Sequence, residues 1–390
     1  MGWKTMDVRD QRVRFVVEAT SGKLPMSVLC AEFGISRPTG YLWLNRYRAA
    51  GLSGIAEQSR RPHSSPQRTA ESVEAHVVQL RQSYPDWGAR KLAVLLGRQG
   101  LELASTTVHR ILLRHDLVAD SDRRTQAVQR FERERPNELW QMDFKGPRGW
   151  RQPVGPLSII DDHSRYLIAL AATGSTHAAS VRDRLEQAFI DCGLPEGMLM
   201  DHGVPWCSTQ APAGSTRLTF WLMRQGIRLH WSHFRHPQTQ GKVERFHGSL
   251  LRALNKRGTP LHDTQKWLDD YRWEHNHIRP HEALGMQTPA SRWLPSTRRY
   301  DPHLPPWQYP EDAWVLKVDC QGKIDVKGTR WKISRALAGD WVQLQPVENR
   351  ILVYYCNTLM RELDPSIHRA TIVARWIEDK DNNKSKNLAK

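Results

Sequence analysis

The sequence has 390 residues, which suggests several domains, and its 57 Lys and Arg against 41 Asp and Glu give a formal net charge of +16. This positive excess is spread over the whole chain and favours nucleic acid as the partner. No apolar run reaches the roughly 20 residues of a membrane span, no GxxxxGK[ST] loop predicts ATP hydrolysis by the chain itself, and five dispersed cysteines without a CxxC pair argue against a disulfide framework.

Residues 1–60 are predicted to form a helix-turn-helix DNA-binding domain. Apolar residues recur at helical spacing over residues 7–49, Gly34 permits a tight turn, and Ser36 can cap the helix that follows. That helix would lie in the major groove, with an ordinary three-helix bundle as the alternative. The residues predicted to contact DNA are Arg37, Thr39, Tyr41, Arg46 and Arg48.

Residues 61–118 are predicted to form a second helix-turn-helix DNA-binding domain. A helix with Trp87 and Leu92 on one face ends at Gly100, and Ser105 can cap the next helix. On that next helix the predicted DNA contacts are Thr106, Thr107, His109 and Arg110. Two such modules can together read a longer DNA site than one. The charged segment 119–136 is predicted to be a linker.

The pattern changes to short apolar runs between turns from Asn137 onwards. Residues 137–300 read as strand, strand, strand, helix, strand, helix, which predicts an α/β domain with a mixed sheet. Residues 301–366 alternate apolar and polar positions around turns, which predicts a small antiparallel β-barrel. Residues 367–390 are expected to be mostly disordered. The cysteines are interpreted as buried thiols.

Three carboxylates fall in structured contexts of the α/β domain. Asp143 lies within a strand, Asp201 ends the strand MLMD, and Glu244 lies at the beginning of a helix. Such positions can converge at one edge of a sheet. Three carboxylates suit a pair of Mg²⁺ ions, which prefer oxygen ligands and serve in-line phosphoryl transfer. The alternative is that the three acids are separate turn or capping residues.

Four strings carry a resemblance to a known family. WQMDF, MDHGVPW, SHFRHPQTQGKVERFHGSL and HNHIRPHEALGMQTPASRW, within about residues 135–295, resemble the catalytic core of the retroviral-integrase superfamily, specifically the bacterial insertion-sequence DDE transposases. This resemblance implies a ribonuclease-H-like fold. It also implies that Asp143, Asp201 and Glu244 are the catalytic, metal-binding triad for two Mg²⁺ ions, with Mn²⁺ as a substitute. In the first helix-turn-helix, Cys30 and Gly40 depart from the usual alanine and β-branched residue, which predicts a recognition helix less stable by about 1 kcal/mol.

Neighbouring residues offer competing interpretations. Asp161 and Asp162 compete for the first catalytic position, but a turn role is favoured for both. His230, His233 and His236 lack partners at zinc-ligand spacing, so no structural zinc is predicted. Three basic residues beside Glu244 are predicted to hold phosphates, namely Lys242, Arg245 and His247. Asn276, Arg279 and His281 are ambiguous, and Trp206 is suggested as a stacking surface for an unpaired base.

The resulting hypothesis is a DNA transposase. It would bind the terminal inverted repeats of a mobile element, cut DNA to expose 3′-hydroxyls and join them to target DNA. We expect a homo-oligomer on double-stranded DNA and a cytoplasmic, nucleoid-associated location without membrane attachment. A separate ATPase regulator is an optional further partner. The alternatives are a catalytically inactive DNA-binding regulator or assembly protein and a ribonuclease-H-type nuclease acting on hybrids.

Overall fold

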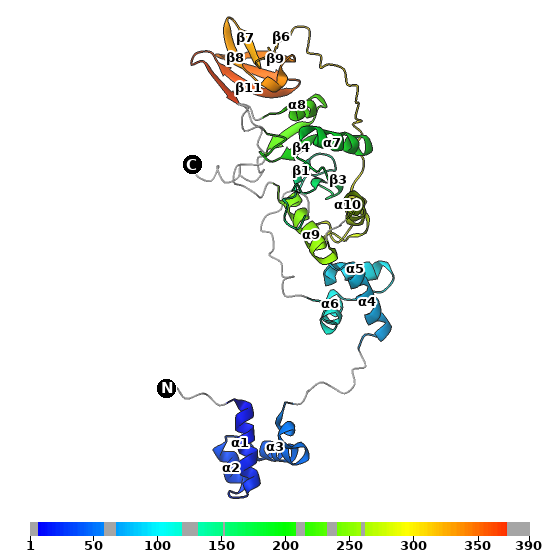
Figure 1. Cartoon of the computed structure of the whole chain (residues 1–390), viewed down its shortest axis with the longest axis vertical. Coiled ribbons are helices and arrows are strands. Elements are labelled where there is room, and N and C mark those ends of the chain that lie inside the picture. Colours follow the sequence, from blue (N-terminus) through cyan, green and yellow to red (C-terminus); the bar gives the residue numbers. More distant parts are fainter. Residues whose placement is uncertain are drawn as a thin grey trace. The chain divides into compact units, whose positions relative to one another are not determined.

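The computed structural model describes residues 7–57, 68–118, 132–150, 153–207, 215–231, 240–258 and 262–372. The chain divides into two compact units, Met1–Ala70 and Glu71–Lys390 (Figure 1). No helix in the described ranges is long and apolar enough to cross a membrane. Most of the predicted linker 119–136 and the end of the chain after Ile372 lie outside the described residues.

The first unit is a small helical bundle. Its helices are α1 (Val8–Ser21), α2 (Met26–Glu32) and α3 (Arg37–Ala50), followed by the 3-10 turn η1 (Gly51–Ile55). Gly34 has a φ of 62°, which fits the tight turn predicted between α2 and α3. Ser36 caps α3 as predicted, because its Oγ accepts a hydrogen bond from the Thr39 backbone N–H at 3.4 Å.

Three further helices open the second unit: α4 (Glu71–Ser83), α5 (Ala89–Arg98) and α6 (Ser105–Arg114). They enclose their own core, which includes Trp87 and Leu92. Gly100 has a φ of 83° in the turn after α5. The expected cap by Ser105 is wrong: α6 begins at Ser105, its N-cap is Ala104, and no side chain accepts a capping hydrogen bond there. The hydroxyl is one position too late in the chain to cap the free N–H groups.

The central sheet of the second unit has the strand order β3-β2-β1-β4-β5. Its strands are β1 (Trp140–Phe144), β2 (Leu157–Asp161), β3 (Leu167–Ala171), β4 (Gly197–Met200) and β5 (Arg228–Trp231). The first three strands pair antiparallel, whereas β4 pairs parallel with both β1 and β5. This is the mixed sheet predicted from the order of elements.

Helices cover both faces of this sheet. They are α7 (Ala178–Cys192), α8 (Arg217–Arg224), α9 (Gly241–Arg257) and α10 (Thr264–Trp273), which continues into the π-helical turn η4 (Glu274–Ile278). Buried residues of α7 and α8 share a core with Trp140 and Met142, whereas α9 and α10 share a second core with Ile160 (Figure 1). Successive side chains of β1 therefore point to opposite faces of the sheet. Trp140 and Met142 face the layer of α7 and α8, and Gln141 and Asp143 face the layer of α9 and α10.

Residues after about 300 form an open β-structure instead of the predicted closed barrel. Short 3-10 turns, η5 (Glu282–Leu284), η6 (Pro289–Arg292) and η7 (Arg335–Leu337), flank or interrupt this region. Its strands are β6 (Trp314–Lys317), β7 (Lys323–Val326), β8 (Thr329–Lys332), β9 (Trp341–Val347), β10 (Arg350–Tyr355), β11 (Thr358–Asp364) and β12 (Arg369–Ile372). Five of them pair in the order β12-β11-β10-β9-β6, and β7 pairs only with β8. Among the described residues, β12 and β6 are opposite edges, so the sheet does not close. Residues 367–390 are expected to be mostly disordered, but Arg369–Ile372 within this segment form the strand β12.

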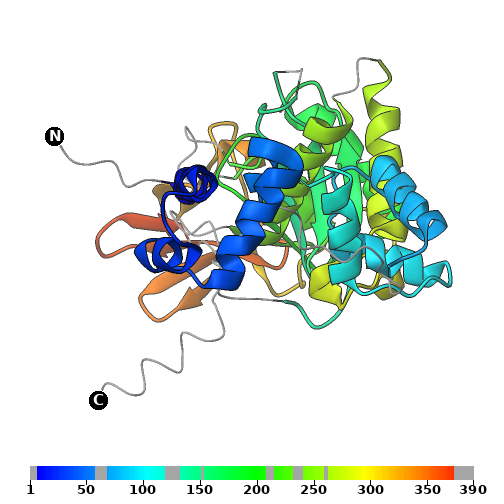
Figure 2. The ribbon, with the colours of Figure 1, turned by 90° about the horizontal axis from the view of Figure 1, so that it is seen from below.

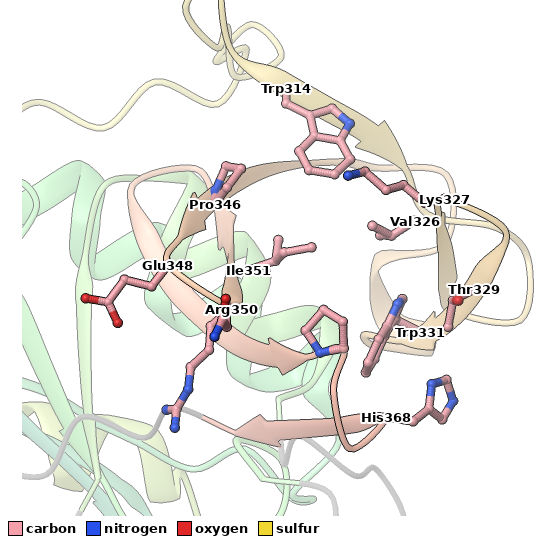
Figure 3. Close-up of a pocket in the computed structure, with 12 residues that line it drawn as sticks. Trp314, Val326, Lys327, Thr329, Trp331, Pro346, Glu348, Arg350, Ile351 and His368 are labelled. Carbon is pink, nitrogen blue, oxygen red and sulfur yellow. The ribbon is translucent and has the colours of Figure 1, made fainter.

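The open β-structure has a groove between its hairpins. It is lined by apolar side chains that include Trp314, Trp331 and Ile351, and its volume is about 360 Å³. Figure 3 shows these side chains facing the hollow, while Glu348 and Arg350 point away from it. Arg350 is engaged outside the groove in an ion pair with Glu362.

The cysteines only partly fit the interpretation as buried thiols. Cys30, Cys192 and Cys356 are buried, but Cys207 is half-buried and Cys320 is exposed. Cys320 lies in the turn between β6 and β7.

Candidate active site and DNA-binding surfaces

The three predicted acidic residues come from adjacent elements. Asp143 lies on β1, and Asp201 directly follows β4, the parallel neighbour of β1. Since Gln141 pairs with Leu199 in that register, Asp143 and Asp201 lie at the same level of the sheet. Glu244 lies in the first turn of α9, the helix that covers this part of β1 and β2. The fold therefore brings the three carboxylates to one region.

The electrostatics of Asp143 reflect this convergence. The pKa of its carboxyl is raised to about 7, first by burial and then by the negative charges of Asp201 and Glu244. A hydrogen bond donated by the Phe144 backbone N–H acts in the opposite direction. Partial desolvation of the carboxyl also raises the pKa of Glu244, although its side chain is largely exposed. The site has an excess of negative charge around Asp143.

Asp201 is held in place from its own loop. Its Oδ1 accepts hydrogen bonds from the Gly203 backbone N–H at 3.0 Å and from the Trp206 indole Nε1 at 2.7 Å. A Cβ at Gly203 would stand 2.9 Å from Asp201 Oδ2, so a larger residue there would displace this carboxylate. Trp206 is buried and stacks on Phe144 at 5.6 Å between ring centroids. The suggested stacking of Trp206 on a DNA base is therefore wrong: this indole orients a carboxylate.

A polar cluster fixes the start of α9, just before Glu244. Asp162 is fully buried and accepts hydrogen bonds from Gln141 Nε2 at 2.7 Å and from Lys242 Nζ. The Val243 backbone N–H in turn donates to Gln141 Oε1 at 3.4 Å. These contacts join β1, the end of β2 and α9. Glu244 is thereby tied to the strand that carries Asp143.

Asp161 has the turn role that was favoured for it. It is buried and accepts hydrogen bonds from the Ser164 backbone N–H at 2.8 Å, from the Ser164 hydroxyl at 2.6 Å and from the Asn137 backbone N–H at 2.7 Å. Asp162 differs from the prediction, since it holds Lys242 rather than a turn. Both carboxylates are committed to contacts within the protein.

The three basic residues beside Glu244 have different surroundings. Lys242 forms an ion pair with Asp162, and only 14% of its side chain is exposed. His247 is equally covered, and its Nε2 lies 3.1 Å from Ser158 Oγ. Burial, followed by the charge of Lys145, lowers the pKa of His247 to about 4, so its imidazole is neutral. Arg245 is exposed and is the one of the three that faces solvent.

The donor set of this site fits a cation that prefers oxygen ligands. Three carboxylates surround a region where mutual repulsion already raises the pKa of Asp143, and a divalent cation would offset that repulsion. In the described ranges, no three His, Cys, Asp or Glu side chains form a preassembled metal-binding group. His230 lies on β5, while His233 and His236 lie outside the described residues.

The recognition helix α3 presents part of its predicted DNA-binding set to solvent. Arg37, Tyr41 and Arg48 are exposed. Thr39 is half-buried, and its hydroxyl lies 2.9 Å from that of Ser36. The Arg46 guanidinium lies 5.0 Å from the Trp43 ring centroid, so it is partly engaged on its own helix.

On α6, the corresponding helix of the second module, the residues predicted to contact DNA also differ in their exposure to solvent. Thr106, His109 and Arg110 are exposed, whereas Thr107 is half-buried. Val108, Ile111 and Leu112 form the buried face of α6. The polar side chains predicted to contact DNA thus occupy the face opposite the core of the module.

The contacts between this second module and the α/β core could not be predicted from the sequence. Lys91 Nζ donates to the Pro280 carbonyl at 2.6 Å, and Arg98 donates to the Ile278 carbonyl at 2.8 Å. Asp86 accepts from Arg257 Nε and from Arg279, both at 2.8 Å. Figure 2 shows α4 to α6 beside the helices of the core. The contact of buried Asp86 with two arginines that are distant in the sequence leaves no local sequence pattern that could predict it.

The residues left ambiguous in HNHIRPHEALG are structural. Asn276 Oδ1 accepts from the Leu167 backbone N–H at 2.8 Å, and its Nδ2 donates to the Leu167 carbonyl at 3.1 Å. Arg279 is buried against Asp86. Burial lowers the pKa of His281. These side chains hold the turn after α10 against β3 and against the second module.

The comparisons with known proteins agree with this organisation. Models described as "Integrase core domain" match residues 133–237 and 225–289, a "Helix-turn-helix domain" matches 11–63, and a "Homeodomain-like domain" matches 39–112. The "Insertion element IS476 uncharacterized 39.2 kDa protein" of Xanthomonas euvesicatoria is 25% identical over 256 residues, covering 63% of this chain and 72% of its own. The "Transposase for transposon Tn552" of Staphylococcus aureus is 22% identical over 437 residues, covering 97% and 88%.

Among solved structures, the HTLV-2 integrase catalytic core domain in complex with magnesium matches 41% of this chain and 97% of that chain, with 18% identity and a TM-score of 0.32. The mixed sheet, its helix layers and the family matches define an integrase-type α/β core preceded by helix-turn-helix DNA-binding domains. The integrase-core and helix-turn-helix matches, together with relatives named as insertion-element and transposon proteins, support the resemblance to insertion-sequence DDE transposases of the integrase superfamily that the sequence motifs indicate.

Proposed function

We propose that the protein is a DNA transposase that binds the terminal inverted repeats of a mobile element, cuts DNA to expose 3′-hydroxyls and joins them to target DNA. The observation that carries this proposal is the convergence of Asp143, Asp201 and Glu244: burial, followed by the negative charges of Asp201 and Glu244, raises the pKa of Asp143 to about 7. Carboxylates gathered against their mutual repulsion are typical of sites that bind cations.

In this proposal Asp143, Asp201 and Glu244 hold two Mg²⁺ ions, for which Mn²⁺ can substitute. When bound, such ions supply activation of the attacking oxygen and stabilisation of the leaving oxygen in phosphoryl transfer. Asp201 is oriented for this role by Trp206 and Gly203, and Glu244 by the polar cluster at the start of α9. Arg245, exposed beside Glu244, is placed to contact DNA phosphate.

The reaction has two balanced steps. Water attacks the phosphorus at the element end, the bond to the 3′-oxygen breaks, and that oxygen leaves as a 3′-hydroxyl. The 3′-hydroxyl then gives up its proton as its oxygen attacks a target phosphorus, and the target 3′-oxygen leaves and takes up a proton to become a hydroxyl. Because two ends are joined in one event, a homo-oligomer on double-stranded DNA is part of the proposal, with cellular DNA in the cytoplasm as the place of action.

The helices α3 and α6 are proposed to read the terminal repeats. Each presents exposed polar residues on the face opposite its own core, with Arg37, Tyr41 and Arg48 on α3 and Thr106, His109 and Arg110 on α6. These side chains suit contacts with base edges and phosphates in the major groove.

Substitution of the acidic residues tests the proposal. We expect Asp143→Asn, Asp201→Asn and Glu244→Gln each to abolish cleavage and strand joining on labelled element ends, because each removes a charged oxygen ligand. Binding of end DNA should be retained, as measured by gel shift. Asp183→Asn, at an exposed position of α7, is the matched control and should remain active.

Two outcomes would contradict the proposal. Full joining activity in the three variants would exclude the assigned residues. A wild-type chain that binds element ends but neither cuts nor joins them with Mg²⁺ or Mn²⁺ would favour the inactive DNA-binding regulator, and cleavage of RNA in hybrids alone would favour a ribonuclease-H-type nuclease.

A further inference from the structure

His247 and Ser158 lie beside Asp143 on the α9 side of the sheet. Ser158 is the residue of β2 directly opposite Asp143 in the antiparallel register with β1. Residues paired in this way point to the same face of a sheet. His247 reaches that face from α9, one turn after Glu244. Three neighbouring elements therefore bring one carboxylate, one hydroxyl and one imidazole together.

The contacts of the imidazole connect the other two groups. His247 Nε2 lies 3.1 Å from Ser158 Oγ, and His247 Nδ1 lies 3.8 Å from Asp143 Oδ2. Ser158 is fully buried, and 14% of the His247 side chain is exposed. The first contact is a hydrogen bond. The second is longer than a hydrogen bond and is an electrostatic contact between the imidazole and the carboxylate.

Electrostatics decides which ring nitrogen carries the hydrogen. A neutral imidazole has one N–H group and one lone pair. With the hydrogen on Nε2, the Nδ1 lone pair would face the carboxylate of Asp143, and the two would repel. With the hydrogen on Nδ1, Ser158 donates its hydroxyl hydrogen to Nε2, and the Nδ1–H group points towards Asp143 Oδ2. The second arrangement is favoured wherever Asp143 is ionised.

We propose that Ser158 and His247 are positioning residues that set the orientation of the Asp143 carboxylate for cation binding. Ser158 fixes the tautomer of His247, and His247 Nδ1–H restricts rotation of the carboxylate from the α9 side. This inference rests on the proposed function, because it concerns the same site. It adds a partner for Asp143, at a longer distance than the hydrogen bond by which Trp206 holds Asp201.

Two amide substitutions separate the two nitrogens of the imidazole. In His247→Asn, the side-chain amide occupies the place of Nδ1, so it keeps a donor towards Asp143 and loses the contact with Ser158. In His247→Gln, the amide reaches the place of Nε2, so it keeps the contact with Ser158 and loses the donor. Ser158→Ala leaves the imidazole but frees its tautomer.

The measurement is the affinity of the full chain for Mn²⁺ without DNA, by isothermal titration. We expect His247→Gln to bind Mn²⁺ about 10-fold more weakly than wild type, in the range seen for residues that support metal ligands. His247→Asn should stay within about 3-fold of wild type, and Ser158→Ala should fall between the two variants. Asp143→Asn should lose most of the binding.

His177→Gln, at an exposed position before α7, is the matched control and should leave Mn²⁺ affinity unchanged. Wild-type affinity in His247→Gln, or equal losses in the Asn and Gln variants, would overturn the proposal. If His247→Gln does not fold, as judged by thermal denaturation, Ser158→Ala decides: unchanged affinity overturns the proposal and a several-fold loss supports it. A chain that shows the expected order of Mn²⁺ affinities but joins no DNA refutes the proposed function and not this inference.

Discussion

Cys30 and Gly40 occupy one small space in the core of the first unit. A Cβ at Gly40 would stand 2.5 Å from Cys30 Sγ and 2.9 Å from Phe15 Cζ. The thiol of Cys30, which is buried, fills the volume that a side chain at position 40 would need. The two departures seen in the sequence are therefore complementary, since the larger residue on α2 accompanies the smaller one on α3.

Gly40→Ala should destabilise the first unit by about 1–2 kcal/mol, because the overlap with Cys30 outweighs the gain of about 1 kcal/mol in helix propensity. The double variant Cys30→Ala, Gly40→Ala should recover most of that loss, since the thiol is gone. Hydrogen exchange of residues 8–55 in the full chain measures both effects. Stabilisation by Gly40→Ala alone would show that the two side chains do not compete.

Some residues of the candidate site can be identified from short sequence motifs, whereas the roles of others depend on contacts between distant parts of the chain. Asp143, Asp201 and Glu244 lie in motifs of a few residues, so a resemblance could suggest them, although their catalytic role stays a prediction. The contacts of Trp206 with Asp201 and of Lys242 with Asp162 depend on pairings set by the folded chain. A sequence pattern shows that Lys242 is basic but not that a buried carboxylate holds it.

Local sequence patterns predicted the helices and strands. They could not predict which distant strands pair with one another. The alternation of residues 314–355 indicated antiparallel strands, but closure of a barrel depends on whether β12 meets β6, and it does not among the described residues. Ser36 and Ser105 look alike in sequence, yet only Ser36 precedes its helix and caps it. A shift of one residue decides the outcome.

The exposed face of α6 carries Arg110, which is predicted to contact DNA. Arg110→Ala should weaken binding to element ends by about 10- to 100-fold and reduce the preference for end DNA over scrambled DNA, because a contact with a base edge is worth about 1–3 kcal/mol. Fluorescence anisotropy with both DNAs measures this preference. Arg90→Ala, an exposed arginine at the start of α5, is the matched control and should change both affinities equally and less. Equal behaviour of the two variants would indicate non-specific charge attraction.

The positive charge that suggests a nucleic-acid partner also affects how the stability of the protein depends on pH. His275 is buried and His281 is half-buried, and both lie near Arg279, Lys91 and Arg165. Burial, followed by the charge of Arg279, lowers the pKa of His275 to about 3, and burial lowers that of His281 as well. Both imidazoles are neutral in the folded chain, and their protonation would add charge to an already basic interior.

The sign of the pH dependence follows from proton uptake on unfolding. Below about pH 6.5 the unfolded chain protonates these histidines and the folded chain does not, so stability falls as the pH is lowered towards 4. Each histidine contributes at most about 1.4 kcal/mol per pH unit. Asp143 acts in the opposite direction, because its raised pKa lets the folded chain bind a proton below about pH 7 that the unfolded chain binds only below about 3.9.

Urea denaturation of the second unit in the full chain, followed between pH 7 and pH 4.5, should therefore show a falling free energy of unfolding. Asp143→Asn should make this fall steeper by about one proton, or about 1.4 kcal/mol per pH unit, because the substitution removes the opposing group. His281→Asn should make it shallower by a similar amount. Asp183→Asn serves as the control and should leave the slope unchanged. An identical slope in Asp143→Asn and wild type would mean that Asp143 ionises as an ordinary carboxylate, and the crowding of negative charge at the candidate site would then be absent in solution.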